Sequence, residues 1–236
     1  MGWTLVTGGA HRLGARICLD LAERKHSVLV HYHTSHQEAE SVVKACRSLG
    51  AVAEMIQGDF TTIATTEAFI KKSQGHFPIK ALINNVGNYL VKSASNTTVE
   101  EWSALFQSNL FVPFALSRAY LPTLCQYEGS IINIGIAGID RVQANTYSTA
   151  YMSAKMALLM LTKSLAKEMV SKRVRVNMVS PGYLENAIDL PEAVGHLPMG
   201  RPGTLEEVSR VVMFLLEETN SYITGQNIEV AGGVRL

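Results

Sequence analysis

The stretch Thr7-Gly8-Gly9-Ala10-His11-Arg12-Leu13-Gly14 decides how this chain begins to fold. It follows the β-branched run Trp3–Thr7 and leads into Leu13–Lys25, a segment with helical spacing. Glycines permit a tight turn between strand and helix, and they let the backbone come close to a phosphate. The helix that follows offers free N–H groups and the positive end of its dipole to that phosphate. The turn therefore predicts a phosphate-binding site, although an ordinary strand-to-helix loop can have a similar composition.

Apolar, β-branched runs alternate with helical segments along the whole chain. The expected strands are Trp3–Thr7, Ser27–Tyr32, Ala51–Gln57, Ala81–Asn84, Ser130–Ile134, Arg173–Val179 and Asn227–Val230. The expected helices are Leu13–Lys25, Ser35–Leu49, Thr65–Gln74, Val99–Tyr120, Thr149–Val170 and Thr204–Glu217. Parallel strands are joined by helices that cover the sheet, so this alternation predicts an α/β fold. We expect residues 1–236 to form a single Rossmann domain, with a doubly wound seven-stranded parallel sheet and helices on both faces.

The composition narrows the class of protein further. A length of 236 residues fits one large α/β domain, and 47% hydrophobic residues supply a sizeable core. A net charge of +1 gives no sign of a nucleic-acid or membrane partner. The three cysteines, Cys18, Cys46 and Cys125, match no zinc or disulfide spacing, so we expect reduced thiols and no metal site. The first strand begins too early to leave room for a signal peptide, which favours a cytoplasmic location.

The end of the second expected strand indicates which dinucleotide binds. A carboxylate there would take the ribose 2′-hydroxyl of NAD, but the sequence reads His31-Tyr32-His33-Thr34-Ser35 and has no carboxylate before Glu38. Imidazoles, hydroxyls and a nearby cation favour a 2′-phosphate, and Arg12 can supply the cation. The stretch and Arg12 together predict NADP(H). Taken singly, each fits an ordinary surface histidine or a solvated charge.

Tyr151 and Lys155 form the candidate acid–base pair. Their i, i+4 spacing places both side chains on one face of a helix. An ammonium beside a phenol favours the phenolate and lowers the phenol pKa, which is about 10 without such a neighbour. A tyrosine activated in this way can give a proton to a carbonyl oxygen while hydride arrives from nicotinamide.

The segment Tyr183–Gly203 contains three prolines and three glycines and has neither helical nor strand periodicity. A long loop in a compact domain is more often functional than idle, so we expect a substrate loop that covers the site.

With these residues in hand, the sequence resembles the classical short-chain dehydrogenase/reductase family along essentially its whole length. The resemblance implies that Asp59 approaches the adenine and that Asn85 and Gly87, in a close match to the family's N-N-A-G, border the cofactor. It implies that Asn109 joins Tyr151 and Lys155 by holding a water in a proton relay. Further cofactor contacts are implied for Gly8, Leu13, Gly14, Lys155, Pro181, Gly182 and Leu184.

Within the family, the turn with Arg12 and the His31–Ser35 stretch look most like pteridine reductases. There the matching arginine, histidine and serine surround the 2′-phosphate of NADP. Tyr89 falls where those enzymes carry an aromatic residue that stacks on the pterin, although it also fits a packing tyrosine. The C-terminal third looks equally like 3-oxoacyl-acyl-carrier-protein reductases, which makes an acyl carrier protein a possible partner. Lys172, Arg173 and Arg201 are candidates for its docking patch.

The chain departs from the family in two places. About thirteen residues before the tyrosine the family has a serine, or an aspartate in pteridine reductases, and the stretch Asn133–Gly138 offers neither. Gly135 or Ile136 takes that place beside the substrate, and Asp140 or Ser148 are possible substitutes. In addition, Thr34 stands where pteridine reductases have a second arginine.

The segment Met156–Leu161 is apolar nearly all round, which predicts a second buried surface on its helix. The resemblance implies a homotetramer in which this helix and Val99–Tyr120 form one interface, and a monomer with a buried helix is the alternative. The sequence as a whole predicts an NADPH-dependent reductase of a small carbonyl or C=N substrate, either pteridine-like or a 3-oxoacyl thioester. The alternative is a catalytically weak NADPH-binding protein with a sensing or scaffolding role, suggested by the missing serine.

Overall fold

The computed structural model describes residues 2–185, 187, 190 and 193–234. Its centre is a sheet of seven strands, in which every neighbouring pair is parallel. The strands are β1 (Trp3–Val6), β2 (Ser27–Tyr32), β3 (Ala53–Gln57), β4 (Ile79–Asn84), β5 (Ser130–Ile134), β6 (Arg175–Pro181) and β7 (Asn227–Val230). Their order is β3-β2-β1-β4-β5-β6-β7, so the strand order reverses between β1 and β4. Ligands of open α/β sheets bind outside the carboxyl ends of the strands at such a reversal.

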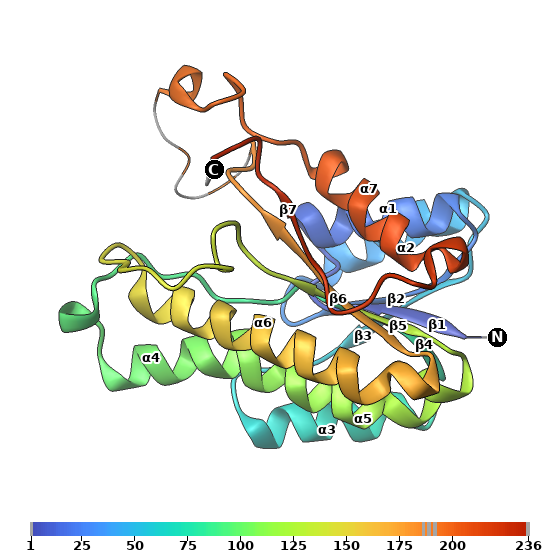
Figure 1. Cartoon of the computed structure of the whole chain (residues 1–236). Helices are drawn as coiled ribbons and strands as arrows, with labels where there is room; N and C mark the ends of the chain where they lie inside the picture. The colour runs from blue at the N-terminus through green and yellow to red at the C-terminus, as the bar shows by residue number, and fades with distance from the viewer. Residues whose placement is uncertain (1, 186, 188–189, 191–192, 235–236) are drawn as a thin grey trace.

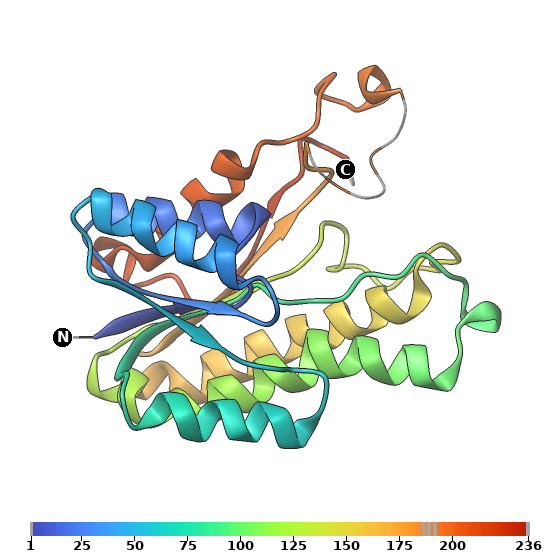
Figure 2. The same ribbon diagram turned by 180° about the vertical axis from the view of Figure 1, so that it is seen from behind.

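Helices cover both faces of the sheet (Figures 1 and 2). One face carries α1 (Arg12–Glu23), α2 (His36–Ser48) and α7 (Leu205–Leu216), with α1 packed between the other two. The other face carries α3 (Ile63–Gln74), α4 (Val99–Phe106), α5 (Val112–Gln126) and α6 (Thr149–Met169). The expected doubly wound parallel sheet is thereby confirmed.

Burial explains why the strand sequences are apolar on both sides. Every residue of β2, β5 and β6 is buried, because helices lie above and below the strands. Two of the three buried clusters lie on opposite faces of the sheet. The first contains Ile17, Val30 and Val212 on the α1–α7 face, and the second contains Leu116 and Ile131 on the α5 face. Among the described residues no helix is long and apolar enough to cross a membrane.

The predicted helix Val99–Tyr120 is wrong in its continuity and in its end. The structure has α4, then a π-helical turn, η2 (Gln107–Phe111), and then α5, which continues to Gln126. Pro113 supplies the physical reason, because it has no N–H to donate to the carbonyl of Asn109 four residues earlier. The resulting bulge lies at Asn109, one of the expected site residues.

The expected loop at 183–203 lies in part outside the described residues, which omit 186, 188–189 and 191–192. Its two ends are joined by a parallel bridge between Leu184 and Gly203. Two backbone hydrogen bonds reinforce the bridge, from Gly203 to Tyr183 at 2.9 Å and from Glu185 to Gly203 at 3.0 Å. The base of the loop is therefore anchored at the end of β6.

Candidate active site

The glycine turn between β1 and α1 has no room for side chains. Gly8 has a φ of +63°, which favours glycine, and a Cβ on Gly14 would collide with the carbonyl oxygen of Gly8. The turn is braced from the end of β4. Asn85 donates its side-chain amide to the carbonyl of Thr7 at 2.9 Å, and its backbone N–H donates to the Thr7 hydroxyl at 2.8 Å. The backbone at the N-terminus of α1 can therefore be approached closely, as a phosphate-binding site requires.

His31 supports this turn from inside the protein. Its Nδ1 accepts a hydrogen bond from the N–H of Gly8 at 3.0 Å, so Nε2 carries the proton and donates to the carbonyl of Gly58 at 3.2 Å. The ring stacks on Phe60 with centroids 4.3 Å apart. Burial lowers the pKa of His31 to about 3, so the imidazole is neutral. The expected direct contact between His31 and a 2′-phosphate is therefore wrong: both ring nitrogens are already bonded.

A groove of about 470 Å³ runs along the carboxyl ends of β1, β4 and β6. It brings together most of the expected cofactor residues, namely Gly8, Arg12, Leu13, Gly14, Asn85, Gly87, Pro181, Gly182 and Leu184, with the expected catalytic Tyr151 and the expected substrate residue Gly135. A smaller cavity of about 210 Å³ shares Gly8 and Val86 with the groove and is lined by His33 and Asp59. Phosphates at the turn and an adenine in the smaller cavity fit this layout, so these residues could hold a nicotinamide dinucleotide.

The far end of this site contains several polar side chains. Nε2 of His33 lies 3.6 Å from a carboxylate oxygen of Asp59. Hydrogen bonds from the backbone N–H of Thr61 lower the pKa of Asp59, and the carboxylate is therefore ionised at neutral pH. Thr34 is exposed and Ser35 half-buried, where the chain turns from β2 into α2.

Arg12 lies at the mouth of the groove. Its side chain is exposed and forms no ion pair within the described part of the chain. Its φ of +46° puts a non-glycine residue in the left-handed region, at a cost of about 1 kcal/mol. An exposed, unpaired guanidinium on a strained backbone is a reasonable candidate for a functional residue.

Tyr151 and Lys155 lie on one face of α6, and Tyr151 lines the groove. The Lys155 side chain is buried, its Nζ donates to the carbonyl of Ile134 at 2.7 Å, and it lies 5.7 Å from the centre of the Tyr151 ring. Burial lowers the pKa of Lys155 to about 8, which leaves most of it protonated at pH 7. A positive charge is thus held beside the phenol, as acid catalysis by the tyrosine requires.

Asn109 approaches the same point from the π-helical turn η2. Its Nδ2 donates to the carbonyls of Asn88 at 2.9 Å and Leu105 at 3.0 Å. Its Oδ1 is buried and accepts no hydrogen bond from the described residues. A Cβ on Gly87 would collide with this oxygen and come within 3.3 Å of Lys155 Nζ. Gly87 therefore leaves a narrow space between Asn109 and Lys155, which a proton relay needs.

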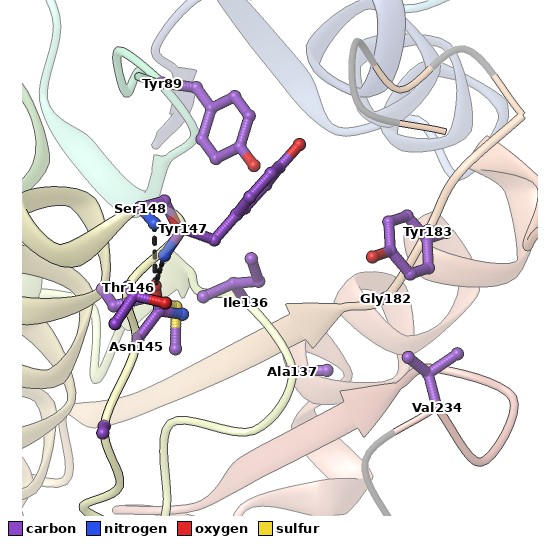
Figure 3. A pocket seen from close by; sticks show the side chains of 12 residues that line it. Tyr89, Ile136, Ala137, Asn145, Thr146, Tyr147, Ser148, Gly182, Tyr183 and Val234 are labelled. Carbon is purple, nitrogen blue, oxygen red and sulfur yellow. Dashed lines mark hydrogen bonds between the residues drawn. The ribbon is translucent and has the colours of Figure 1, made fainter. Parts of the chain in front are cut away.

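A second cavity, the inner pocket, opens beside the groove. It has a volume of about 360 Å³ and shares Tyr89, Ile136 and Gly182 with the groove. Figure 3 shows Tyr89, Tyr147 and Ser148 on one side of it and Tyr183 and Val234 on the other. The ring of Tyr89 stands edge-on to that of Tyr151, with centroids 4.8 Å apart. Tyr89 therefore links the inner pocket to the candidate acid.

The surroundings of Gly135 and Ile136 differ. Ser180 Oγ fills the space where a side chain on Gly135 would lie, so Gly135 has no room for a hydroxyl. Ile136 borders both the groove and the inner pocket, where it presents an apolar wall at one of the two places expected for the family's serine. Asp140 cannot replace that serine, because it accepts from Asn227 at 2.8 Å and lies 3.9 Å from Lys163, outside both cavities.

Several lining residues escaped the sequence analysis, namely Asn145, Tyr147, Met152 and Tyr183. Asn145 carried a usable signal, because asparagine is common in turns and this one lies shortly before an expected helix. The tyrosines carried none, since any of them also fits a packing or surface position. Among the described residues, no group of three or more His, Cys, Asp or Glu could hold a metal ion.

This fold and this site define an oxidoreductase that takes a nicotinamide cofactor. The chain belongs to the short-chain dehydrogenase/reductase family, as the motifs led us to expect. The family model described as enoyl-(acyl carrier protein) reductase matches residues 8–235. A putative oxidoreductase of Bacillus subtilis (strain 168), YtkK, is 30% identical over 250 residues, with 100% of this chain and 97% of the relative covered. The 3-oxoacyl-[acyl-carrier-protein] reductase FabG of Staphylococcus aureus (strain Mu50) is 30% identical over 241 residues, with 98% and 96% covered.

Solved structures agree with this assignment. The blue fluorescent protein from a metagenomic library, in complex with NADPH, superposes with a TM-score of 0.91 at 26% identity, covering 100% of this chain and 98% of that one. The acetoin dehydrogenase of Enterobacter cloacae superposes with a TM-score of 0.90 at 27% identity, covering 99% and 95%.

Proposed function

We propose that this protein is an NADPH-dependent reductase of a small carbonyl or C=N group. The observation that carries the proposal is the junction of the two cavities. There the buried ammonium of Lys155 lies beside Tyr151, which lines the nucleotide-sized groove and contacts Tyr89 of the inner pocket. This is the arrangement that a proton donor needs between a hydride source and its acceptor.

Each residue of the site has a separate role in the proposed reaction. NADPH, when bound, supplies the hydride. Tyr151 gives its proton to the substrate oxygen or nitrogen, and the Lys155 ammonium stabilises the phenolate that remains. Asn109 Oδ1 lies next to Lys155. It accepts a hydrogen bond from a member of the relay through which Tyr151 regains its proton. Pro181 and Gly182 bring backbone without bulky side chains to the nicotinamide end of the groove.

The preference for NADP rests on charge at the adenosine end. Arg12, His33 and Ser35 surround the 2′-phosphate in this proposal, with Thr34 beside them. His31 contributes by fixing the turn. Asp59 is the only carboxylate among the described residues that line the cavity with His33, and it accepts hydrogen bonds from the backbone N–H and the hydroxyl of Thr61. The NADPH complex of a similar structure supports this choice.

The inner pocket favours an uncharged substrate. Its described lining residues carry no charged side chain and include Tyr89, Tyr147 and Tyr183. Phenols and apolar groups bind planar or short apolar molecules well, and burial of a carboxylate without a cation would be unfavourable. A 3-oxoacyl thioester and a pterin both remain within this class, and Tyr89 is the residue that would stack on a pterin.

The inferred docking patch for an acyl carrier protein is not supported by the positions of its residues. Arg173 pairs with Glu128 at the amino end of the sheet, beyond the far end of α6. Arg201 pairs with Glu207 at 2.7 Å, at the start of α7. Lys172 and Arg173 therefore lie about 30 Å from Tyr151, the length of a 20-residue helix, and cannot join Arg201 in one patch on the same subunit.

We also propose that the segment 183–203 closes over the bound substrate.

We propose further that the protein is a homotetramer. The apolar side chains of Phe111, Phe114 and Met160 are exposed along η2, α5 and α6, and Met160 is 73% exposed. These helices lie side by side, so a second copy could cover them together. Light scattering should give four chains, and Met160→Glu should shift the mass toward smaller species.

The second candidate is a weakly catalytic NADPH-binding protein, which the apolar Ile136 favours. A panel separates the two: dihydrobiopterin, dihydrofolate, an acetoacetyl thioester, a simple quinone and 2,3-butanedione, each with NADPH and with NADH. We expect turnover of one chemical class, faster with NADPH. Binding of NADPH without turnover of any member would favour the sensing role.

A further inference from the structure

The wall formed by Ile136 leaves the substrate without its usual hydroxyl partner on that side of the inner pocket. A carbonyl oxygen that gains negative charge needs hydrogen-bond donors, and one missing donor typically costs about 100-fold or more in rate. A second donor beside Tyr151 must therefore come from elsewhere in the pocket if the reductase is efficient.

Ser148 has the position and the freedom to be that donor. It lines the inner pocket, is only 3% exposed, and precedes the first residue of α6. A serine at this position normally accepts a hydrogen bond from its own helix, but the Ser148 side chain forms no capping bond. Nor does its hydroxyl bond to any other residue in the part of the chain that the structure describes.

Asn145 holds the segment that leads into the helix. Its Oδ1 accepts from the backbone N–H groups of Tyr147 at 3.0 Å and Ser148 at 2.7 Å (Figure 3). Its carbonyl accepts from the Thr149 hydroxyl at 2.6 Å. The start of α6 is thus held by a neighbouring residue, which leaves the Ser148 hydroxyl available to a ligand.

The helix places Ser148 close to the candidate acid. Ser148 is the residue before α6, and Tyr151 lies in the first turn of that helix, three residues later. Tyr89 lines the inner pocket together with Ser148 and also contacts the Tyr151 ring. Of the other hydroxyls in the lining, Thr146 and Tyr147 are exposed, and Tyr147 is 54% exposed. Ser148 alone among the aliphatic hydroxyls of the lining is withdrawn from solvent.

We propose that Ser148 donates a hydrogen bond to the substrate carbonyl oxygen and so replaces the serine that Ile136 displaces. This role rests on the proposed reductase function. In the reduction, the carbonyl carbon gains the hydride from NADPH, the C=O π bond breaks, and the oxygen takes its proton from Tyr151. The Ser148 proton stays on Ser148, which stabilises the developing alkoxide without being consumed.

Kinetics test the role first. With 2,3-butanedione and NADPH, Ser148→Ala should lower kcat by about 100-fold, the loss typical of one oxyanion donor. The Kd for NADPH should not change, and Ser148→Thr should retain most of the turnover. The matched control is Ser153→Ala on the same helix, whose hydroxyl bonds to the Thr149 carbonyl at 2.8 Å and lies outside both cavities. An undiminished kcat in Ser148→Ala would overturn the proposal.

A spectroscopic test separates this role from the reductase function. Infrared spectra of carbonyl-¹³C 2,3-butanedione are recorded on Tyr151→Phe loaded with NADP⁺, which has no hydride to donate. A hydrogen bond from Ser148 lowers the carbonyl stretching frequency, and adding Ser148→Ala should raise it again. If the frequency is the same with and without the serine, Ser148 does not touch the carbonyl, whatever the turnover of the wild type. If the frequency responds while the wild type turns over none of the panel, Ser148 contacts the carbonyl and the proposed reductase function fails.

Discussion

The imidazole of His31 accepts a hydrogen bond from the backbone N–H of Gly8, so one buried side chain at the end of β2 sets the shape of the phosphate turn after β1. The same ring donates to the carbonyl of Gly58 after β3. Three neighbouring strand ends are thereby joined through one neutral histidine. The arrangement depends on protonation, because a second proton on the ring would remove the acceptor that Gly8 uses.

This relationship predicts a loss of stability in acid. The pKa of His31 is about 3 in the folded protein, below the value of about 6.5 expected for the unfolded chain. Stability is therefore fully present above pH 6.5 and falls as the pH drops toward 3, where only the unfolded state binds the proton. Between pH 7 and pH 5 the contribution is about 2 kcal/mol. Urea unfolding of His31→Phe should lack this part of the pH dependence, whereas His76→Gln, at an exposed position, should keep it. Equal pH dependence in wild type and His31→Phe would show that His31 is not buried neutral.

Arg12→Ala should weaken NADPH much more than NADH. Loss of a charged hydrogen bond to the 2′-phosphate costs about 1.5 to 3 kcal/mol, or roughly 10- to 150-fold in Kd. Fluorescence titration with both nucleotides measures the ratio. Arg24→Ala, at the other end of α1, serves as the control and should leave both affinities unchanged. Equal weakening of the two nucleotides would remove the case for phosphate recognition by Arg12.

Tyr151→Phe should bind NADPH as the wild type does and lose turnover by about 100- to 10,000-fold, because the ring remains and only the proton donor is removed. The measurement pairs a binding titration with the rate of NADPH oxidation. Tyr222→Phe, at a fully exposed position, is the control for the substitution itself. Substantial turnover in Tyr151→Phe would exclude this phenol as the acid.

Gly87→Ala should abolish most turnover while the protein stays folded. The added methyl group would meet Asn109 Oδ1 and lie 3.3 Å from Lys155 Nζ, so it would close the space between the two polar groups. Gly75→Ala is the matched control, because a Cβ there meets nothing within 4 Å. Thermal unfolding and the rate of NADPH oxidation are compared for both variants. Wild-type rates in Gly87→Ala would show that the space is not used.

Local sequence patterns were sufficient to predict most of the architecture. Three strands, Ser27–Tyr32, Ser130–Ile134 and Asn227–Val230, begin and end where the sequence predicts. The ends of other strands differ from the predicted ends where burial or strand pairing, rather than composition, sets them. One example is β6, which continues through Pro181 because it still pairs with β7. The break at η2 depended on one missing N–H at Pro113, whose effect appears only when the hydrogen bonds of the whole helix are followed.

The sequence by itself determined the glycine turn, the strand–helix alternation and the spacing of Tyr151 and Lys155, because these features depend on the backbone needs and periodicity of neighbouring residues. Only the tertiary structure decided that His31 is sealed against Phe60 and Gly58, that Ser148 faces the inner pocket, and that Arg173 and Arg201 lie apart. Each of those outcomes depends on contacts between residues far apart in the chain. Such contacts are set by packing, and no short window of sequence contains them.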